Sequence, residues 1–449
     1  MTAPLCRLVC AGCGAAPREG EPYPFRCPNA GQGDVDHVLV RVLAAGGLAW
    51  PDHDGAAGQP FVRYRTLLHS YHRAIAGGLA DQDFVGLVER LDAAVAGVDG
   101  AGFTATPYAR SDLISERLGF TGPAGLWVKD ETGNVAGSHK GRHLMGVLLH
   151  LEVAEAIGIA VASGRPDLAI ASCGNAALAA GVVARAGSRR LRVFVPVDAD
   201  PWILDRLRDL EADVVACPRA PGEWGDPAYN ALRRAVAEGA LPFTCQGNEN
   251  GLVIEGGGTL GYEIVSSLVA AGAELDHLVV QVGGGALASA CVQSFVEAVA
   301  LGALAPPPRI HTVQTYGAHP LERAYHRVAA LLPGDPSSAD IDDAVHTAAT
   351  HRSAYMWPWE SEPKSIATGI LDDETYDWRA VVGGMLHTGG RPVVVTEAQL
   401  AEAHALGREA GAAVDPTGTS GLAGVLALRE QGVIGARDRV AVLFTGVER

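Results

Sequence analysis

The chain has 449 residues, and 35 lysines and arginines stand against 51 aspartates and glutamates, which gives a formal net charge of −16. This length and a hydrophobic content of 48% allow a sizeable core, which excludes a disordered, collagen-like or membrane-spanning class. The acidic balance argues against general binding to nucleic acid or anionic lipid, because both partners need a basic surface. We therefore expect no nucleic acid and no membrane as partners.

The cysteines and the first residues bear on the cellular compartment. The chain has eight cysteines in 449 residues, and a disulfide framework is not expected at so low a density of cysteines. The first ten residues contain Pro4 and Arg7 and lack the continuous apolar run of a secretory signal, so we expect a reducing, cytoplasmic environment. Residues 277–296 carry no formal charge and have the length of a membrane helix, but three successive glycines and several polar residues favour a strand, a turn and a helix.

The first hundred residues form an N-terminal extension with a cysteine knuckle. Cys10 and Cys13 are spaced Cys-x2-Cys, and Cys27 follows later before a proline, which resembles half of a structural zinc ribbon. A complete ribbon would place another cysteine near position 30, where this chain has alanine. Cys6 or His37 can supply a fourth ligand. The alternative is a vestigial knuckle with free thiols and no zinc.

From about residue 125 onward, short β-branched segments alternate with longer alanine-rich amphipathic segments. Strands that alternate with helices predict βαβ units and a mostly parallel sheet, and two such sheets account for the length. The predicted strands are 126–128, 168–171, 191–197, 214–217, 278–282, 310–313, 392–396 and 440–444. Residues 305–362 contain a triple proline and a turn cluster, and we expect them to run over the surface or across a subunit interface.

Lys140 stands out after the strand and glycine-containing loop of residues 125–137. The pattern predicts a helix that begins near Ser138, which places Lys140 in its first turn, where the helix macrodipole disfavours a cation. A lysine held there as a neutral amine is a nucleophile that forms Schiff bases with carbonyl compounds. The alternative is a harmless, solvent-exposed lysine.

Two further strand–turn–helix segments provide anion sites. Residues 171–177 place Ser172, Cys173, Gly174 and Asn175 at a helix N-terminus, which suits a carboxylate; an ordinary N-cap is the alternative. The segment of Gly283, Gly284, Gly285 and Ala286 follows a buried strand, and its glycines let the backbone wrap a phosphate. It has neither the lysine of a nucleotide P-loop nor the spacing of a dinucleotide fingerprint.

A reactive lysine, a carboxylate site and a small phosphate site together indicate pyridoxal 5'-phosphate and an amino-acid substrate. The ordered motifs from residue 104 onward resemble the fold-type II pyridoxal-phosphate enzymes, the superfamily of threonine synthase, serine/threonine dehydratase and the tryptophan synthase β subunit. The knuckle and residues 62–68 further resemble the start of threonine synthases. The matching segments are 106–107, 129–131, 138–140, 172–175, 283–285, 365–369, 415–418 and 445–446.

The resemblance implies an α/β fold of two doubly wound, mostly parallel-sheet domains with the cofactor in the cleft between them. The implied domains are an extension (1–100), a large cofactor-binding domain (101–145 and 246–449) and a small mobile domain (146–245). It also implies a homodimer. Lys140 would form the internal aldimine and move the α-proton, Asn175 would bond the ring hydroxyl, Gly283 to Ala286 would hold the phosphate, and Thr445 would meet the pyridine nitrogen.

Residues 172–175 would also receive the substrate carboxylate, with Thr106 nearby. The lysine motif departs from the usual threonine synthase pattern, because His139 precedes the lysine and Arg142 follows it. His139 and Arg142 could bind an anionic side chain or leaving group, or they could belong to a solvated helix start. Residues 356–374 could line the substrate entrance or an interface.

We therefore expect a lyase of the threonine synthase or serine/threonine dehydratase type. It would catalyse β-elimination or β-replacement on a hydroxy- or otherwise β-substituted amino acid through a Lys140 aldimine and an aminoacrylate. A neutral hydroxyl at Thr445 favours prompt loss of a β-substituent, because it cannot stabilise a pyridinium as a carboxylate would. The alternatives are threonine synthase, which converts O-phosphohomoserine to L-threonine, and a catalytically silent module that binds the cofactor.

Overall fold

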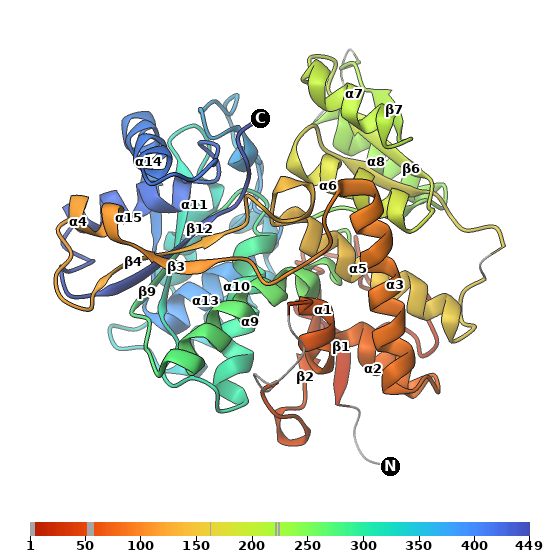
Figure 1. Cartoon of the computed structure of the whole chain (residues 1–449), viewed down its shortest axis with the longest axis horizontal. Helices are drawn as coiled ribbons and strands as arrows, with labels where there is room; N and C mark the ends of the chain where they lie inside the picture. Colours follow the sequence, from red (N-terminus) through yellow and green to blue (C-terminus); the bar gives the residue numbers. More distant parts are fainter. Residues whose placement is uncertain (1–4, 52–57, 162, 221, 223–224) are drawn as a thin grey trace.

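The computed structural model describes residues 5–51, 58–161, 163–220, 222 and 225–449. Figure 1 shows two lobes side by side, with the N-terminal extension packed below the second lobe. The first lobe contains a six-stranded sheet, the second a four-stranded sheet, and the extension a two-stranded sheet. This arrangement confirms the predicted α/β architecture with two main sheets.

The large sheet has the strand order β11-β10-β9-β12-β4-β3. Among its described pairs β3 and β4 run antiparallel and the others are parallel. In β9, Leu278 and Val280 enter one core and Val279 enters the other, so both faces of the sheet are covered. The strands are β3 (Tyr108–Ser111), β4 (Gly125–Asp130), β9 (His277–Gln281), β10 (Arg309–Thr315), β11 (Pro392–Val395) and β12 (Arg439–Phe444).

Helices cover both faces of the large sheet, which makes it doubly wound as predicted. Residues from α9 to α13 share one core with the sheet, and residues from α4, α14 and α15 share the other. In such a sheet, ligands bind beyond the carboxyl ends of the strands. The helices are α4 (Asp112–Arg117), α9 (Val253–Ala271), α10 (Ala286–Ala300), α11 (Pro320–Ala329), α12 (Ser338–Ala349), α13 (Trp378–Thr388), α14 (Glu397–Glu409) and α15 (Ser420–Glu430).

The smaller lobe has the parallel strand order β7-β6-β5-β8. Residues of α6 and α7 pack on one face and those of α8 on the other. The elements are β5 (Leu168–Ala171), β6 (Leu191–Val195), β7 (Asp213–Ala216), β8 (Leu241–Pro242), α6 (Asn175–Ala186), α7 (Pro201–Asp209) and α8 (Pro227–Ala237). Helix α5 (Lys140–Ala156) contacts both α9 and α6. The expected boundary between residues 145 and 146 falls inside this helix, and the domain boundaries stay predictions.

The N-terminal extension is bound to the rest of the chain by a shared core. Phe61, Phe84 and Val88 pack in the same cluster as residues of α5 and α6. Its elements are the antiparallel strands β1 (Cys6–Cys10) and β2 (Leu39–Leu43) and the helices α1 (Pro60–Arg63), α2 (His69–Ala76) and α3 (Asp81–Asp99). Short 3-10 turns lie at Ala45–Gly47, Arg65–Leu67, Val135–Gly137, Arg352–Ala354 and Thr368–Ile370.

The predicted elements can now be compared with the observed ones. All eight predicted strands coincide with strands of the two main sheets, and residues 277–296 are β9, a glycine turn and the start of α10. No helix within the described residues is both long and apolar enough to cross a membrane. The expectation that residues 305–362 run over the surface was wrong, because Leu321, Val328 and Met356 are fully buried in the large lobe.

Candidate functional site

The residues before Lys140 lie beside the end of the central strand β12. Ser138 forms a bridge with Gly446, and the backbone N–H of His139 donates to the carbonyl oxygen of Thr445 at 3.2 Å. Since β12 lies between β9 and β4, the loops that follow all three strands meet at one edge of the sheet. This edge carries most of the predicted site residues.

Lys140 is the first residue of α5, as its sequence context predicts, and its side chain is partly buried. Its positive charge acts on the carboxyl groups of Asp372 and Asp377 and on the thiol of Cys245. Cys245 follows β8 of the smaller lobe, and the two aspartates belong to the large lobe. Lys140 therefore lies between the lobes, where groups from both reach it.

The glycine loop, Gly283 to Gly285, connects β9 to α10. Gly285 has φ +97°, a conformation that glycine adopts without strain, and Ala286 is the first residue of α10. A side chain at Gly283 would collide with the Asp372 carboxylate, and one at Gly284 would come within 2.9 Å of the Tyr376 ring. The missing side chains therefore leave room for close neighbours of the backbone.

Residues 372–377, which we call the acidic segment, provide those neighbours. The Gly284 backbone N–H donates to Asp372, the Thr375 hydroxyl donates to the Gly283 carbonyl at 3.1 Å, and the Asp377 N–H donates to the Gly284 carbonyl at 3.0 Å. Burial raises the pKa of Asp372 to about 6 and the pKa of Asp377 to about 7. The sequence left open whether residues 356–374 line the substrate entrance or an interface, and of these residues the structure places Asp372 against the glycine loop.

The predicted carboxylate loop, Ser172 to Asn175, joins β5 to α6 in the smaller lobe. The Gly174 N–H donates to the Ser172 hydroxyl at 3.4 Å, Cys173 is exposed, and Asn175 begins α6. A side chain at Gly446 would come within 2.6 Å of the Asn175 amide nitrogen. Asn175 therefore reaches across to the end of β12, which brings this loop to the same edge as Lys140.

Thr445 is held in place by Gln281, a residue that the sequence analysis did not assign to the site. The Gln281 side-chain amide donates to the Thr445 hydroxyl oxygen at 2.9 Å and also faces the carbonyl oxygens of Gly418 and Leu443. An amide nitrogen has no lone pair to accept a proton, so the Thr445 hydroxyl must donate elsewhere. Its proton is therefore available to an acceptor other than Gln281.

Arg142 does not face the cleft but lies in a buried ionic network. Its side chain is fully buried and forms ion pairs with Glu131 at 2.8 Å and Glu263 at 2.7 Å. Lys129 pairs with Glu263, and the Thr106 hydroxyl donates to Glu131. The partners of Arg142, namely Glu131, Glu263, Thr259 and Thr106, occupy all its N–H groups. This geometry does not favour the predicted role of Arg142 in binding a substrate anion.

His139 is also poorly suited to binding an anion. Its side chain is buried, its Nδ1 lies 3.1 Å from the Thr445 carbonyl oxygen, and that N–H donates to the carbonyl. Burial, and then the charge of Lys140, lower the pKa of His139 well below its usual value. The imidazole is therefore neutral, and its one N–H already donates to Thr445. It fixes the backbone before Lys140 and adds no positive charge to the cleft.

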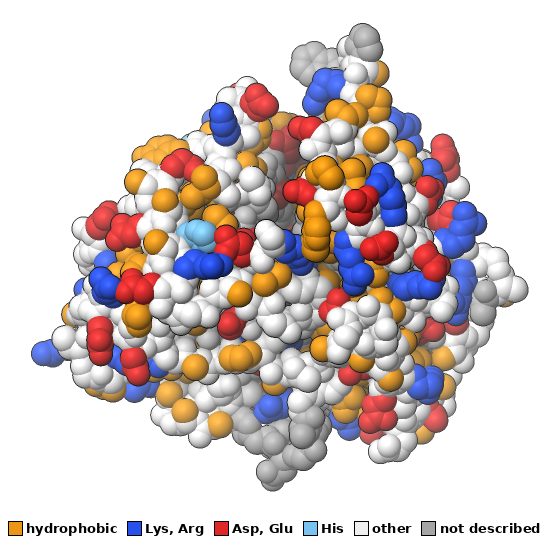
Figure 2. Space-filling model, turned by 45° about the horizontal axis from the view of Figure 1, so that its top comes forward, with side chains coloured by type: hydrophobic (Ala, Val, Ile, Leu, Met, Phe, Trp, Pro, Cys, Tyr) orange, Lys and Arg blue, Asp and Glu red, His pale blue; other side chains and the backbone are white. Residues whose placement is uncertain are grey.

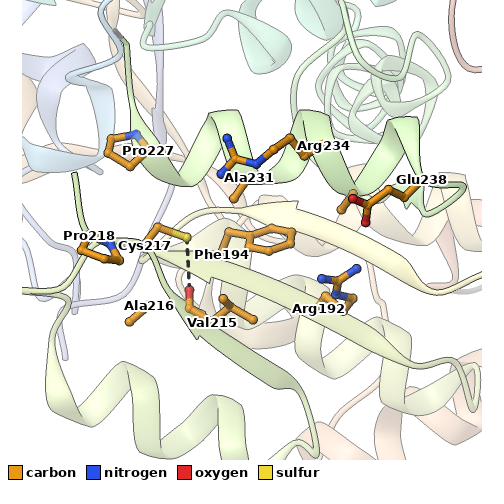
Figure 3. Close-up of a pocket in the computed structure, with 11 residues that line it drawn as sticks. Arg192, Phe194, Val215, Ala216, Cys217, Pro218, Pro227, Ala231, Arg234 and Glu238 are labelled. Carbon is orange, nitrogen blue, oxygen red and sulfur yellow. Dashed lines mark hydrogen bonds between the residues drawn. The ribbon is translucent and has the colours of Figure 1, made fainter. Parts of the chain in front are cut away.

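The molecular surface is hollowed between the two lobes, and acidic side chains stand at this hollow (Figure 2). A separate cavity of about 310 Å3 lies within the smaller lobe, between α8 and the strands β6 and β7 (Figure 3). Arg192, Cys217 and Glu238 are among its lining residues, and none of the predicted site residues lines it. We therefore assign the chemistry to the cleft that contains Lys140.

These features define a two-lobed α/β protein in which Lys140, the glycine loop and the Ser172–Asn175 loop come together. Residues 101–446 match the family model described as pyridoxal-phosphate dependent enzyme, and the chain belongs to this family. Threonine synthase of Methanocaldococcus jannaschii is 23% identical over 342 residues, which span 76% of this chain and 74% of that protein. Biosynthetic L-threonine dehydratase of Corynebacterium glutamicum is 27% identical over 186 residues, which span 40% of this chain and 39% of that enzyme.

Solved structures share the fold. Threonine deaminase isoform 2 of Solanum lycopersicum superposes with a TM-score of 0.59 at 18% identity, over 83% of this chain and 91% of that one. Diaminopropionate ammonia lyase of Escherichia coli superposes with a TM-score of 0.57 at 17% identity, over 82% and 89%. The predicted threonine synthase-like, fold-type II architecture and the predicted cofactor, pyridoxal phosphate, are thus confirmed.

The residues at the sheet edge fit this cofactor. The Asp372 carboxylate already accepts a hydrogen bond from the glycine loop, as a phosphate would. The Ser138 hydroxyl and His143 Nε2 are among the buried polar atoms of the described residues that have no hydrogen-bond partner, and both flank Lys140 in the sequence. Lys140 and the glycine loop would hold the aldehyde and the phosphate, respectively. The individual roles remain predictions.

We expect Asp372→Asn to bind pyridoxal phosphate more tightly than the wild type above pH 6. Asp372 ionises near this pH, and its carboxylate then repels the phosphate, so wild-type affinity should fall as the pH rises through about 6. Well above pH 6, the affinity of Asp372→Asn should exceed that of the wild type by about tenfold for each unit by which the bound phosphate raises the pKa of Asp372. Fluorescence titration of cofactor-free protein between pH 5 and 8 measures it, and equal pH profiles for both proteins would refute it.

Proposed function

We propose that this enzyme catalyses β-elimination or β-replacement on an amino acid with a hydroxyl or another leaving group at Cβ. The observation that carries the proposal is the Gln281–Thr445 hydrogen bond of 2.9 Å, because it leaves a neutral hydroxyl donor at the sheet edge beside Lys140. When bound, the cofactor supplies an electron sink for a carbanion at the substrate Cα. A neutral hydroxyl partner limits that delocalisation, which favours early loss of the β-substituent.

The residues of this chain would share the remaining work. The backbone of the Ser172–Asn175 loop, at the start of α6, would bind the substrate carboxylate. The Lys140 amine would remove the Cα proton and return it where the reaction requires. In elimination, the Cα–H and Cβ–leaving-group bonds break, and the resulting enamine reacts with water to give a 2-oxo acid and ammonium. In replacement, a nucleophile adds to Cβ instead.

Charge around the site favours a substituent that is uncharged or cationic. The charge of Lys140 acts on the carboxyl groups of Asp372 and Asp377. The negative charges of Glu374 and of Asp226 from the smaller lobe contribute to raising the pKa of Asp373. An anionic leaving group would meet these carboxylates, whereas Arg142 is already paired with Glu131 and Glu263. We therefore place hydroxy amino acids and diamino acids ahead of phosphorylated substrates.

Threonine synthase activity is the second candidate. The relative from Methanocaldococcus jannaschii, aligned over 76% of this chain, favours it, whereas the acidic segment does not. A module without activity is less well supported, because Lys140 and the glycine loop are both present. We further propose that the protein is cytoplasmic and forms a homodimer. Sedimentation analysis of the purified protein tests the homodimer.

A substrate panel distinguishes these functions. Purified holoenzyme is mixed separately with L-serine, L-threonine, L-2,3-diaminopropionate, phosphoserine and O-phosphohomoserine, and the cofactor absorbance, 2-oxo acid and phosphate are measured. We expect the absorbance to shift and a 2-oxo acid to form with an uncharged or cationic substrate. Release of phosphate and L-threonine from O-phosphohomoserine alone would overturn the proposal in favour of threonine synthase.

A further inference from the structure

The cysteine knuckle of the N-terminal extension gathers four potential metal ligands far along the chain from Lys140. One ligand atom from each of Cys10, Cys13, Cys27 and His37 lies within 4.8 Å of every other. The Cys13 and Cys27 sulfur atoms are 3.6 Å apart, and the Cys10 sulfur atom is 3.7 Å from His37 Nδ1. Tetrahedral zinc with thiolate and imidazole ligands requires edges of about 3.5–3.8 Å, from its usual bond lengths. Both distances match that geometry.

The protein around these ligands orients them. His37 Nε2 lies 2.9 Å from the Gln32 carbonyl oxygen, which can only accept, so Nε2 carries the proton and Nδ1 offers its lone pair to the cysteines. The N–H of Asn29 donates to the Cys27 sulfur at 3.3 Å, and the N–H of Cys13 donates to the Cys10 sulfur at 3.5 Å. Such hydrogen bonds stabilise thiolates that bind a metal.

Gly12 allows His37 to approach the Cys10–Cys13 turn. A side chain at Gly12 would collide with the backbone carbonyl of Asp36, the residue before His37. The Ala11 N–H donates to the Val38 carbonyl at 2.8 Å, which fixes the two segments side by side. His37, two residues before β2, therefore lies where the fourth ligand of the knuckle is missing, and Cys6, the other residue that the sequence offered for this place, lies outside the cluster.

The same loop is docked against the large lobe. Asp34 accepts hydrogen bonds from the Ser353 N–H at 2.8 Å and from the Ser353 hydroxyl at 2.7 Å. Asp36 lies 3.4 Å from the Arg352 guanidinium, and Arg352 also pairs with Glu374 of the acidic segment. A cavity of about 570 Å3 is bordered by Ala11 and Asp36 of the extension and by Asp377 of the acidic segment. The loop before His37 thus connects to the acidic segment through two ion pairs.

We propose that Cys10, Cys13, Cys27 and His37 bind one Zn²⁺ ion. This ion fixes the loop in which Asp36 pairs with Arg352 of the large lobe, and Arg352 in turn pairs with Glu374 of the acidic segment at the cofactor site. Three thiolates and one imidazole in a tetrahedron form a closed structural site that suits zinc. Zinc binding releases the thiol protons to solvent and changes no oxidation state. The ion therefore acts on cofactor binding through position, and it takes no part in the reaction.

Metal content tests the site in the full-length holoenzyme. Wild type, Cys13→Ser, His37→Ala and the control Cys6→Ser are purified with reductant and zinc chloride, and zinc per chain is measured by mass spectrometry. The Cys6 sulfur atom is hydrogen-bonded to His69 Nδ1 at 3.6 Å, and Cys6 lies outside the cluster. We expect one zinc in the wild type and in Cys6→Ser, and loss of zinc from the other two variants. A wild type without zinc, or ligand variants that keep it, would overturn the site.

A second measurement does not depend on whether the variants fold. Replacing zinc in the wild type with Co²⁺ should give the strong visible absorption of tetrahedral cobalt together with a thiolate-to-cobalt band. A weak octahedral spectrum would overturn the proposed ligand set.

The link to the cofactor site has its own test. Removing zinc with a chelator should weaken pyridoxal phosphate binding in the wild type. Arg352→Gln should bind the cofactor more weakly even with zinc and should respond less to the chelator. If the wild-type dissociation constant is the same with and without zinc, the support of the acidic segment by zinc is refuted.

Discussion

Replacing Lys140 with alanine should reduce turnover by at least about 10⁴-fold, because the variant loses both the amine that binds the cofactor and the base that moves the Cα proton. The chain has only three lysines, Lys129, Lys140 and Lys364. Lys129 is fully buried against Glu263, and Lys364 is exposed on a loop. The lysine at the sheet edge is therefore the one placed for this role, and Lys364→Ala is a matched control.

Borohydride reduction followed by peptide mass spectrometry gives a direct measurement. Reduction makes the lysine–cofactor bond permanent, so the peptide that contains Lys140 should carry the added mass in the wild type and in Lys364→Ala. In Lys140→Ala the added mass and the visible absorbance of the attached cofactor should both disappear, while circular dichroism shows an intact fold. Labelling of Lys129 or Lys364 in the wild type would contradict the assignment.

The sequence predicted the site best where one local pattern contains all the information. A strand, a glycine-containing turn and a helix follow each other around Gly283, Asn175 and Lys140, and in a parallel sheet such turns lie at the carboxyl ends of the strands. The turns at Gly283 and Lys140 belong to the large sheet, and Asn175 reaches the end of β12 from the smaller sheet. The eight strand predictions were confirmed for the same reason, since β-branched segments between helices leave few other interpretations.

Contacts between distant segments were not predictable in this way. Asp372 reaches the glycine loop from a region nearly 90 residues further along the chain, and no periodicity indicates where its carboxylate lies. Arg142 was interpreted as a surface or substrate-binding residue, because its burial depends on Glu263, which is on another helix. A charged residue within the apolar sequence of α5 was the available signal.

The helices α11 and α12 were missed for a different reason. The prolines at 306–308 and the turn cluster at 334–337 dominated the interpretation of residues 305–362. Within that region, Leu321, Ala324 and Val328 are spaced for one helix face. Ser337 and Asp340 form a capping box that marks the start of α12. Both signals are local, and either would have corrected the prediction.

Replacing Arg142 with alanine should lower the free energy of unfolding by about 3–5 kcal/mol, because it leaves buried carboxylates without their partner. Glu131 is fully buried, and Glu263 nearly so. Urea denaturation at pH 7, followed by circular dichroism, measures the effect. The control is Arg117→Ala, since Arg117 pairs with Glu409 where both side chains are exposed, and we expect it to cost less than about 1 kcal/mol.

The dependence on pH separates loss of this charge pairing from loss of packing alone. Burial raises the pKa of Glu131, but the charges of Arg142 and Lys129 outweigh it and lower the pKa overall. The wild type therefore gains stability from Glu131 above its unfolded pKa of about 4.3 and loses it as the pH falls below that value. In Arg142→Ala the unpaired carboxylates favour protonation instead, so the stability gap between the two proteins should narrow between pH 7 and pH 4. A gap that is constant with pH would mean that Arg142 acts through packing alone, and a gap below about 1 kcal/mol at pH 7 would contradict the buried network.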